Sequence, residues 1–169
     1  MRLLYSYEEI LDRTKEIADK LTERFRGKDP VVIGVLKGAC PFLCDLIRHM
    51  DTNVQVDYMH VSSYTDGTES SGVVEIKKDT TVDIKGRDVI IVEDIVDTGR
   101  TLALLKPLLM ERGPSSITVV SMLDKPSRRV VDFDADYVGF TIDDLFVIGF
   151  GLDYNEMYRN LNGIYIYEE

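Results

Sequence analysis

The chain has 169 residues, which is the size of one ordinary domain. Its hydrophobic fraction of 44% can supply a core without disulfides or a structural metal, and this excludes a disordered chain. The 30 acidic residues outnumber the 20 basic ones, and the formal net charge of −10 disfavours sequence-independent binding to nucleic acid.

The sequence features that report on cellular location favour the cytoplasm. No cationic segment followed by an apolar stretch opens the chain, and no apolar run of about 18 residues occurs. We therefore expect a cytoplasmic protein without a membrane partner. Cys40 and Cys44 are four residues apart on a predicted helix, and we expect two reduced thiols packed as small apolar groups.

Apolar residues recur with helical and strand periods in alternation along the chain. Ser6 and Glu9 have the spacing of a capping box at the start of the first helix. Helices are predicted at 7–25, about 41–50 and about 101–112, and strands at 31–36, 54–61, 73–77, 89–92, 117–123, 137–140 and 164–167.

The central strands are apolar throughout, as in strands that are buried on both faces. Strand and helix alternate without a repeat or a linker, which predicts one α/β domain over 1–169, with a mostly parallel twisted sheet flanked by helices. Ligands of such sheets bind beyond the carboxyl ends of the strands. Candidate site residues are therefore sought at 36–38, 93–101 and 124–125, and in the polar segment 62–72, which is predicted to be a loop.

The segment 93–101 carries the strongest chemical signal. Glu93, Asp94 and Asp97 place three mutually repelling carboxylates at the end of the most apolar strand, and a purely structural sequence has little reason to do so. The small and hydroxyl residues at 98–101 lead into a helix, where backbone N–H groups can form a nest of phosphate size. Carboxylates beside such a nest suggest Mg²⁺ or sugar hydroxyls between them. The alternative is an acidic loop before a capped helix, which is less favoured because the strand and the helix flank the motif as a phosphate site requires.

Residues 89–102 resemble the signature of the type I phosphoribosyltransferases that binds 5-phosphoribosyl 1-pyrophosphate (PRPP). The remaining motifs are similar to the hypoxanthine (6-oxopurine) branch of that family, in the family's order and over most of residues 31–160. They are Leu36-Lys37-Gly38, Ser63-Tyr64 with Ser71-Gly72, Lys125, and segment 146–156. The resemblance implies the type I fold, with a core at about 28–135 and a small hood from about 1–10 and 136–169.

The resemblance implies a Mg²⁺-dependent reaction of purine salvage, in which hypoxanthine or guanine displaces pyrophosphate from PRPP to give IMP or GMP. Glu93 and Asp94 would hold the ribose hydroxyls, directly or through Mg²⁺, and Asp97 would be the general acid/base at the purine N7. The 5′-phosphate would be wrapped by Asp97, Thr98, Gly99, Arg100 and Thr101.

The other motifs would complete the site. Pyrophosphate would be received by Leu36, Lys37, Gly38 and Arg159, and the family's Leu–Lys bond at this place is often cis. The purine would be bound by Ile95, Lys125, Phe146 and Val147. Lys125 would donate to the 6-oxo group and so reject adenine, because an amino group would present donors instead.

The metal set and the loop also follow from the resemblance. Two Mg²⁺ ions per active site are implied during turnover, with Glu93, Asp94 and Asp153 as the protein's metal ligands. Ser63 and Tyr64 would close over the site to keep water from the reacting carbon. Taken singly, Lys37-Gly38 would be an ordinary turn, Lys125 a solvated lysine, Phe146 a core aromatic, and Asp153 and Arg159 surface charges.

Two other functions remain open. A related enzyme could use xanthine or another base, and Lys125, Phe146 and Val147 argue for a 6-oxopurine. A PRPP-sensing regulator that binds RNA would need a basic face, and the sequence has no basic cluster with interleaved aromatics. We expect a homodimer or homotetramer that binds small-molecule substrates, and Arg128-Arg129 are expected to be solvated or to form a subunit contact.

Overall fold

The computed structural model describes residues 1–66 and 69–168, with the backbone alone for 63–66 and 69–72. In this part of the chain the helices are α1 Tyr7–Phe25, α2 Cys40–His49, α3 Arg100–Met110 and the short 3₁₀ helix η1 Pro126–Arg128. The strands are β1 Arg2–Tyr5, β2 Val31–Val35, β3 Gln55–Asp66, β4 Glu69–Lys78, β5 Asp88–Val96, β6 Ser116–Asp124, β7 Tyr137–Thr141, β8 Val147–Ile148 and β9 Ile164–Ile166. Among the described residues, no helix is both long and apolar enough to cross a membrane.

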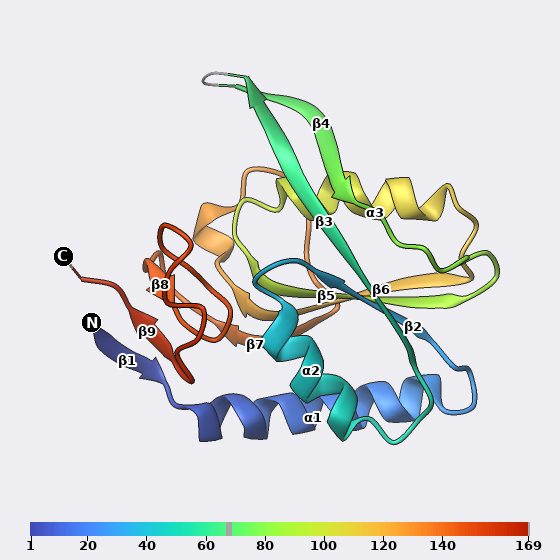
Figure 1. The fold of residues 1–169 in the computed structure, drawn as a ribbon, viewed down its shortest axis with the longest axis horizontal. Coiled ribbons are helices and arrows are strands. Elements are labelled where there is room, and N and C mark those ends of the chain that lie inside the picture. The colour runs from blue at the N-terminus through green and yellow to red at the C-terminus, as the bar shows by residue number, and fades with distance from the viewer. Residues whose placement is uncertain (67–68, 169) are drawn as a thin grey trace.

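The main sheet has the order β4-β3-β2-β5-β6-β7 and is parallel except at β3–β4. Helices α1 and α2 cover one face and α3 covers the other (Figure 1). Alternate residues of β2 serve the two faces, because Val32 packs in the cluster with α1 and α2 whereas Val31 and Ile33 pack with α3. The α/β class with a mostly parallel sheet is confirmed.

The first helix begins and ends where the sequence places it. The Glu9 amide donates to Ser6 Oγ at 3.3 Å and the Ser6 amide donates to Glu9 Oε2 at 2.8 Å, which is the predicted capping box. Cys40 and Cys44 lie half-buried on α2 and are free thiols, as expected. Burial, and secondly the neighbouring Cys44, raise the pKa of Cys40.

A second, smaller sheet is built from the two ends of the chain. Its order is β1-β9-β8, and it lies beside the main sheet with both termini near it (Figure 1). Neither β1 nor β8 was expected from the sequence, since each is short and pairs with a distant segment. β7, which falls within the range expected for the hood, is the edge strand of the main sheet, and the boundaries of core and hood stay a prediction.

The loop predicted at 62–72 is wrong over the described residues 62–66 and 69–72, which belong to β3 and β4. The backbone continues β3 and β4 as an antiparallel hairpin, with pairs from His60↔Lys78 to Asp66↔Glu69, and the hairpin projects beyond the sheet (Figure 1). Its polar composition suggested a loop because it offers no apolar face. The side chains of Ser63 and Tyr64 lie outside the described residues, and their closure over the site stays a prediction.

Candidate active site

A pocket of about 410 Å³ lies beyond the carboxyl ends of β2 and β5. The turn 36–38 after β2 and residues 93–102 at the end of β5 form most of its wall. Glu156 and Arg159 of the C-terminal segment also line it, as do His60, Val61 and Lys77 of β3 and β4. This is the edge of the sheet at which the sequence predicts ligand binding.

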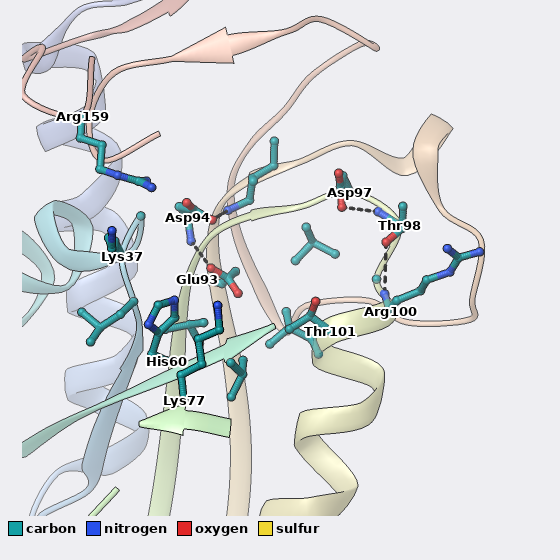
Figure 2. Close-up of a pocket in the computed structure, with 18 of the residues that line it drawn as sticks. Lys37, His60, Lys77, Glu93, Asp94, Asp97, Thr98, Arg100, Thr101 and Arg159 are labelled. Atoms are coloured by element: carbon teal, nitrogen blue, oxygen red, sulfur yellow. Dashed lines mark hydrogen bonds between the residues drawn. The ribbon is translucent and has the colours of Figure 1, made fainter. Parts of the chain in front are cut away.

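Two opposite walls face each other across this pocket. Figure 2 shows Lys37 and Arg159 on one side and Thr98 and Thr101 on the other, with the carboxylates at the end of β5 between them. The structure thus brings together, from three separate segments, side chains that the sequence assigns to pyrophosphate, ribose and 5′-phosphate. Arg100 is different, because its guanidinium extends away from the carboxylates and only its backbone lies at the loop (Figure 2).

Glu93 and Asp94 form the acidic floor of the pocket. Burial raises the pKa of Glu93 well above its ordinary value, and the neighbouring Asp94 charge raises it further. Burial also raises the pKa of Asp94, although hydrogen bonds and the Arg159 charge oppose the shift. The Asp94 amide donates to Glu93 Oε1 at 3.0 Å, and the Ile95 amide donates to Asp94 Oδ1 at 2.6 Å.

The turn after β2 approaches this floor closely. A Cβ on Gly38 would lie 1.6 Å from Asp94 Oδ2, so that only glycine fits there. The Leu36–Lys37 peptide bond is cis, as the family resemblance implied. Ala39 has φ −74°, so its side chain causes no conflict at the third position of the turn.

The loop 97–101 turns from β5 into α3. The Thr98 amide donates to Asp97 Oδ1 at 2.5 Å, and the Arg100 amide donates to Thr98 Oγ1 at 3.4 Å. Gly99 has φ +79° and precedes the first helical residue, which places the helix N-terminus at the pocket.

Lys37 and Arg159 are joined by a carboxylate that the sequence did not reveal. Glu156 Oε2 lies 2.6 Å from Lys37 Nζ, and Glu156 Oε1 lies 3.0 Å from Arg159 Nη2. Hydrogen bonds from Lys37 and then Arg159 lower the pKa of Glu156. Asp153 accepts from the Glu156 amide at 2.9 Å and lies 3.1 Å from Arg159 Nη2.

A second pocket, of about 490 Å³, adjoins the first and shares Asp94, Ile95 and Asp97 with it. The predicted purine residues Lys125, Phe146 and Val147 line it, together with Asp153 and others.

The purine-pocket side chains differ in burial. The Lys125 side chain is only 11% exposed, and burial lowers its pKa, while the charges of Asp144 and Asp97 oppose the shift. Lys125 Nζ lies 3.9 Å from Asp144 Oδ1. Phe146 is 51% exposed and meets Tyr154 edge-on with a centroid distance of 5.7 Å. The expectation for an isolated Phe146, a core residue, therefore does not hold.

A model of the phosphoribosyl transferase domain matches residues 4–155, which is most of the chain. The chain belongs to the phosphoribosyltransferase family. The hypoxanthine-guanine phosphoribosyltransferase of Streptococcus pneumoniae R6 is 49% identical to it over 168 residues, which cover 99% of this chain and 93% of that protein. The protein of the same name from Lactococcus lactis is 52% identical over 160 residues, or 95% and 87% of the two chains.

Solved structures of the family have the same fold. A hypoxanthine phosphoribosyltransferase from Staphylococcus aureus superposes with a TM-score of 0.96 and 46% identity, covering 99% of this chain and 91% of that one. A hypoxanthine-guanine phosphoribosyltransferase from Bacillus anthracis gives a TM-score of 0.95 and 43% identity, with 99% of both chains covered.

Several residues at this phosphoribosyltransferase site were missed by the sequence analysis. His60, Lys77 and Glu156 line the first pocket, and Asp144 lines the second. Each lies outside the contiguous motifs or carries no role in them. Among these residues, only Glu156 could have been found from the sequence, because it is an acidic residue three positions after the predicted metal ligand Asp153.

The prediction that Arg129 is solvated is wrong, and its alternative, a subunit contact, stays a prediction. Its side chain is 13% exposed, and its guanidinium is bonded to the backbone of the loop that follows β5. Arg128 is half-exposed, as expected, and lines the second pocket.

The carboxylates predicted to bind metal do not form a closed protein cage. Among the described residues, no group of three or more His, Cys, Asp or Glu side chains is placed to hold a metal ion. Glu93 and Asp94 line the first pocket, and Asp153 lines the second together with Asp94. Such an open arrangement fits Mg²⁺, which proteins bind through one or two carboxylates with substrate phosphates and water as the remaining ligands.

Proposed function

We propose that this chain is a transferase of purine salvage that converts hypoxanthine or guanine and PRPP into IMP or GMP and pyrophosphate. The observation that carries the proposal is the pair of adjoining pockets that share Asp94, Ile95 and Asp97. One pocket has cations facing a helix N-terminus, which suits PRPP, and the other has an aromatic ring and a buried lysine, which suits a purine. The names of the full-length relatives support the same reaction.

The reacting carbon would lie where the two pockets meet. The purine N9 forms a bond to the anomeric carbon while the bond from that carbon to the pyrophosphate oxygen breaks, and pyrophosphate leaves with the electron pair. The transition state has oxocarbenium character. Asp97 is shared by both pockets, and its carboxylate takes the proton from the purine N7.

The phosphate groups would be divided between the two walls. The loop 97–101 binds the 5′-phosphate through backbone amides and the hydroxyls of Thr98 and Thr101. Lys37 and Arg159, with the backbone of Leu36 and Gly38, bind pyrophosphate on the opposite wall. The phosphate oxygens there replace the carboxylate of Glu156, which holds both cations in the free protein.

The purine would be oriented by one polar contact and one stacking contact. Phe146 stacks on the ring, Ile95 packs against it, and the Val147 backbone contacts its edge. Lys125 donates to the 6-oxo group. Because Lys125 is buried, an adenine amino group would leave its donors unmatched, which disfavours adenine.

Glu93, Asp94 and Asp153 would hold Mg²⁺, and up to two ions per site during turnover. Burial raises the pKa values of the two β5 carboxylates, so that a cation at the pocket restores their charged form. When bound, Mg²⁺ neutralises the charge that develops on pyrophosphate. We further propose a cytoplasmic location and a homodimer or homotetramer, with small molecules rather than nucleic acid or membranes as partners.

The test is a spectrophotometric assay with PRPP and Mg²⁺, in which hypoxanthine, guanine, xanthine and adenine are offered separately and EDTA serves as the control. We expect magnesium-dependent nucleotide formation from hypoxanthine or guanine and little from adenine. Activity with xanthine alone would keep the mechanism and change the substrate. A protein that binds PRPP and turns over none of the four bases would overturn the proposal in favour of a PRPP-sensing regulator.

A further inference from the structure

Arg129 lines neither of the two pockets. Its guanidinium is hydrogen-bonded to the backbone at the end of β5, where Asp94, Ile95 and Asp97 line both pockets. Its Nη1 lies 2.7 Å from the Asp97 carbonyl oxygen and 3.3 Å from that of Val96. Its Nη2 lies 2.5 Å from Asp124 Oδ1 and 3.6 Å from Asp134 Oδ1. A guanidinium with so little exposure must have partners for its N–H donors. Two of the four partners here are the backbone carbonyls of Val96 and Asp97.

The residues after Arg129 hold the next part of the same loop. The Val130 amide donates to the Thr98 carbonyl oxygen at 3.1 Å. A Cβ on Gly99 would lie 3.0 Å from Arg129 Cδ and 3.2 Å from Val131 Cγ2, so the segment packs directly against this glycine. The segment 129–131 thus contacts three consecutive residues of the loop, 97–99.

The hydrogen bonds from Arg129 and Val130 determine the direction in which the loop amides point. In a trans peptide, the C=O of one residue and the N–H of the next are antiparallel. Because the carbonyls of Asp97 and Thr98 face Arg129 and Val130, the amides of Thr98 and Gly99 face the opposite way. The Thr98 amide is bonded to Asp97 Oδ1, whereas the Gly99 amide belongs to the loop that lines the first pocket, and a phosphate bound there would accept from it.

We propose that Arg129 is a positioning residue: by holding the Val96 and Asp97 carbonyls against Asp124, it aims the amides of loop 97–101 at the 5′-phosphate of PRPP and of the nucleotide product. The inference rests on the proposed function, since it assumes that this loop binds that phosphate. Arg129 does not touch the ligand. It therefore affects ligands that carry a 5′-phosphate and leaves pyrophosphate, bound at the opposite wall, unaffected.

The experiment measures the dissociation constants of IMP and of inorganic pyrophosphate, each with Mg²⁺, by calorimetry. Arg129→Gln removes the charge and part of the donor set. Arg129→Lys keeps a cation to pair with Asp124, which preserves the fold. The single ammonium group cannot reach the carboxylate and both carbonyls together, so the loop is no longer held in place. We expect the Kd of IMP to rise roughly tenfold to a hundredfold, as for a misplaced binding group, and the Kd of pyrophosphate to stay within about twofold.

Arg13 provides the matched control. Its Nε donates to the Gly139 carbonyl oxygen at 2.7 Å, and it pairs with Glu16, so it also binds a strand carbonyl, but away from both pockets. Arg13→Lys and Arg13→Gln should change neither dissociation constant, whatever they do to the melting temperature.

Two outcomes would overturn the inference. In one, folded Arg129→Lys binds IMP as tightly as the wild type. In the other, the Arg129 variants lose IMP and pyrophosphate in equal measure, which indicates general damage. If Arg129→Gln does not fold, the lysine variant decides. A wild-type protein that neither binds IMP nor turns over hypoxanthine would instead remove the proposed function, and the inference with it.

Discussion

The two walls of the first pocket are held in different ways. The loop 97–101 is fixed by backbone hydrogen bonds and by Arg129, whose guanidinium is shielded from solvent. On the opposite wall the turn 36–38 is closely packed, but the cationic side chains of Lys37 and Arg159 are linked through Glu156. The side chains of Lys37 and Glu156 are 53% and 62% exposed. Exposed ion pairs contribute little to stability and exchange readily with water and salt.

The difference matches what each wall would do in turnover. The 5′-phosphate stays on the ribose from PRPP to nucleotide, and a rigid nest can bind it in both. Pyrophosphate would arrive bonded to the ribose and depart free. A wall whose cations can exchange the Glu156 carboxylate for phosphate oxygens would accommodate both binding and release. The comparison predicts that damage to the rigid parts of the site is costly and that loosening the Glu156 wall is cheap.

Asp97→Asn should have the largest effect, because it removes the proposed proton acceptor, which lines both pockets. We expect kcat to fall by roughly 10²–10⁴, the usual contribution of a general acid/base, with PRPP binding retained. Asparagine can still accept the Thr98 amide through its side-chain oxygen, so the loop is preserved. Steady-state kinetics and PRPP calorimetry test this, and loss of PRPP binding from a folded variant would contradict the role.

Gly38→Ala should come next. The new methyl group would collide with Asp94, whose Oδ2 lies 1.6 Å from the Cβ position, and either the turn or the carboxylate must move. We expect kcat/KM to fall by roughly a hundredfold, since displacement of a positioned group by an ångström costs about that much.

Ala39→Gly is the control for Gly38→Ala, because it changes the same turn without adding atoms and should keep activity even if it lowers the melting temperature. Wild-type kinetics from folded Gly38→Ala would show that the turn and Asp94 can separate without consequence.

The sequence predicted the parts of the site that are contiguous in the chain. Residues 93–101 combine strand, carboxylates and helix start within one segment, so their spacing alone indicates a ligand. Lys37 and Glu156 are 119 positions apart, and nothing in either local pattern predicts that they meet. Arg129 bonds to backbone carbonyls, which leave no trace in the sequence because every residue has one.

The fold shows the same division. Helix α1 was predictable to its ends, since its cap and its apolar period are local. The hairpin of β3 and β4 was not, because its outer residues are polar and turn-forming in sequence, and strand pairing between backbones leaves no such local pattern. β1 and β8 depend on β9, which is distant from β1 in the chain.

Lys125→Ala tests the second pocket and should act on the purine alone. We expect the KM of hypoxanthine to rise roughly tenfold to a hundredfold, which is the loss of one hydrogen bond from a charged donor, while the KM of PRPP stays near the wild-type value. Lys20→Ala, on the exposed side of α1, is the control. An unchanged KM for hypoxanthine would remove Lys125 from the purine site.

The sign of a pH effect at Lys125 follows from its pKa. Burial lowers the pKa of Lys125, so the protonated donor is lost at a lower pH than for a solvated lysine. The KM of hypoxanthine should therefore rise on the alkaline side before an ordinary lysine would titrate. In Lys125→Ala this rise should be absent, and a rise that persists in the variant would assign it to another group.

Glu156→Gln should have the smallest effect and the opposite direction. The variant removes the carboxylate that we propose competes with phosphate oxygens for Lys37 and Arg159, while its amide oxygen can still accept from one of them. We expect inorganic pyrophosphate to bind roughly two- to fivefold more tightly, the scale of an exposed ion pair. Calorimetry with Mg²⁺ and pyrophosphate measures the change.

Glu23→Gln is the matched control for Glu156→Gln, because Glu23 pairs with Arg26 at 2.7 Å on the exposed face of α1, away from the pocket. It should leave the affinity for pyrophosphate unchanged. Weaker binding of pyrophosphate to Glu156→Gln would mean that Glu156 orients the two cations rather than competing for them. The wall would then be pre-organised like loop 97–101, and the distinction between the two walls would fail.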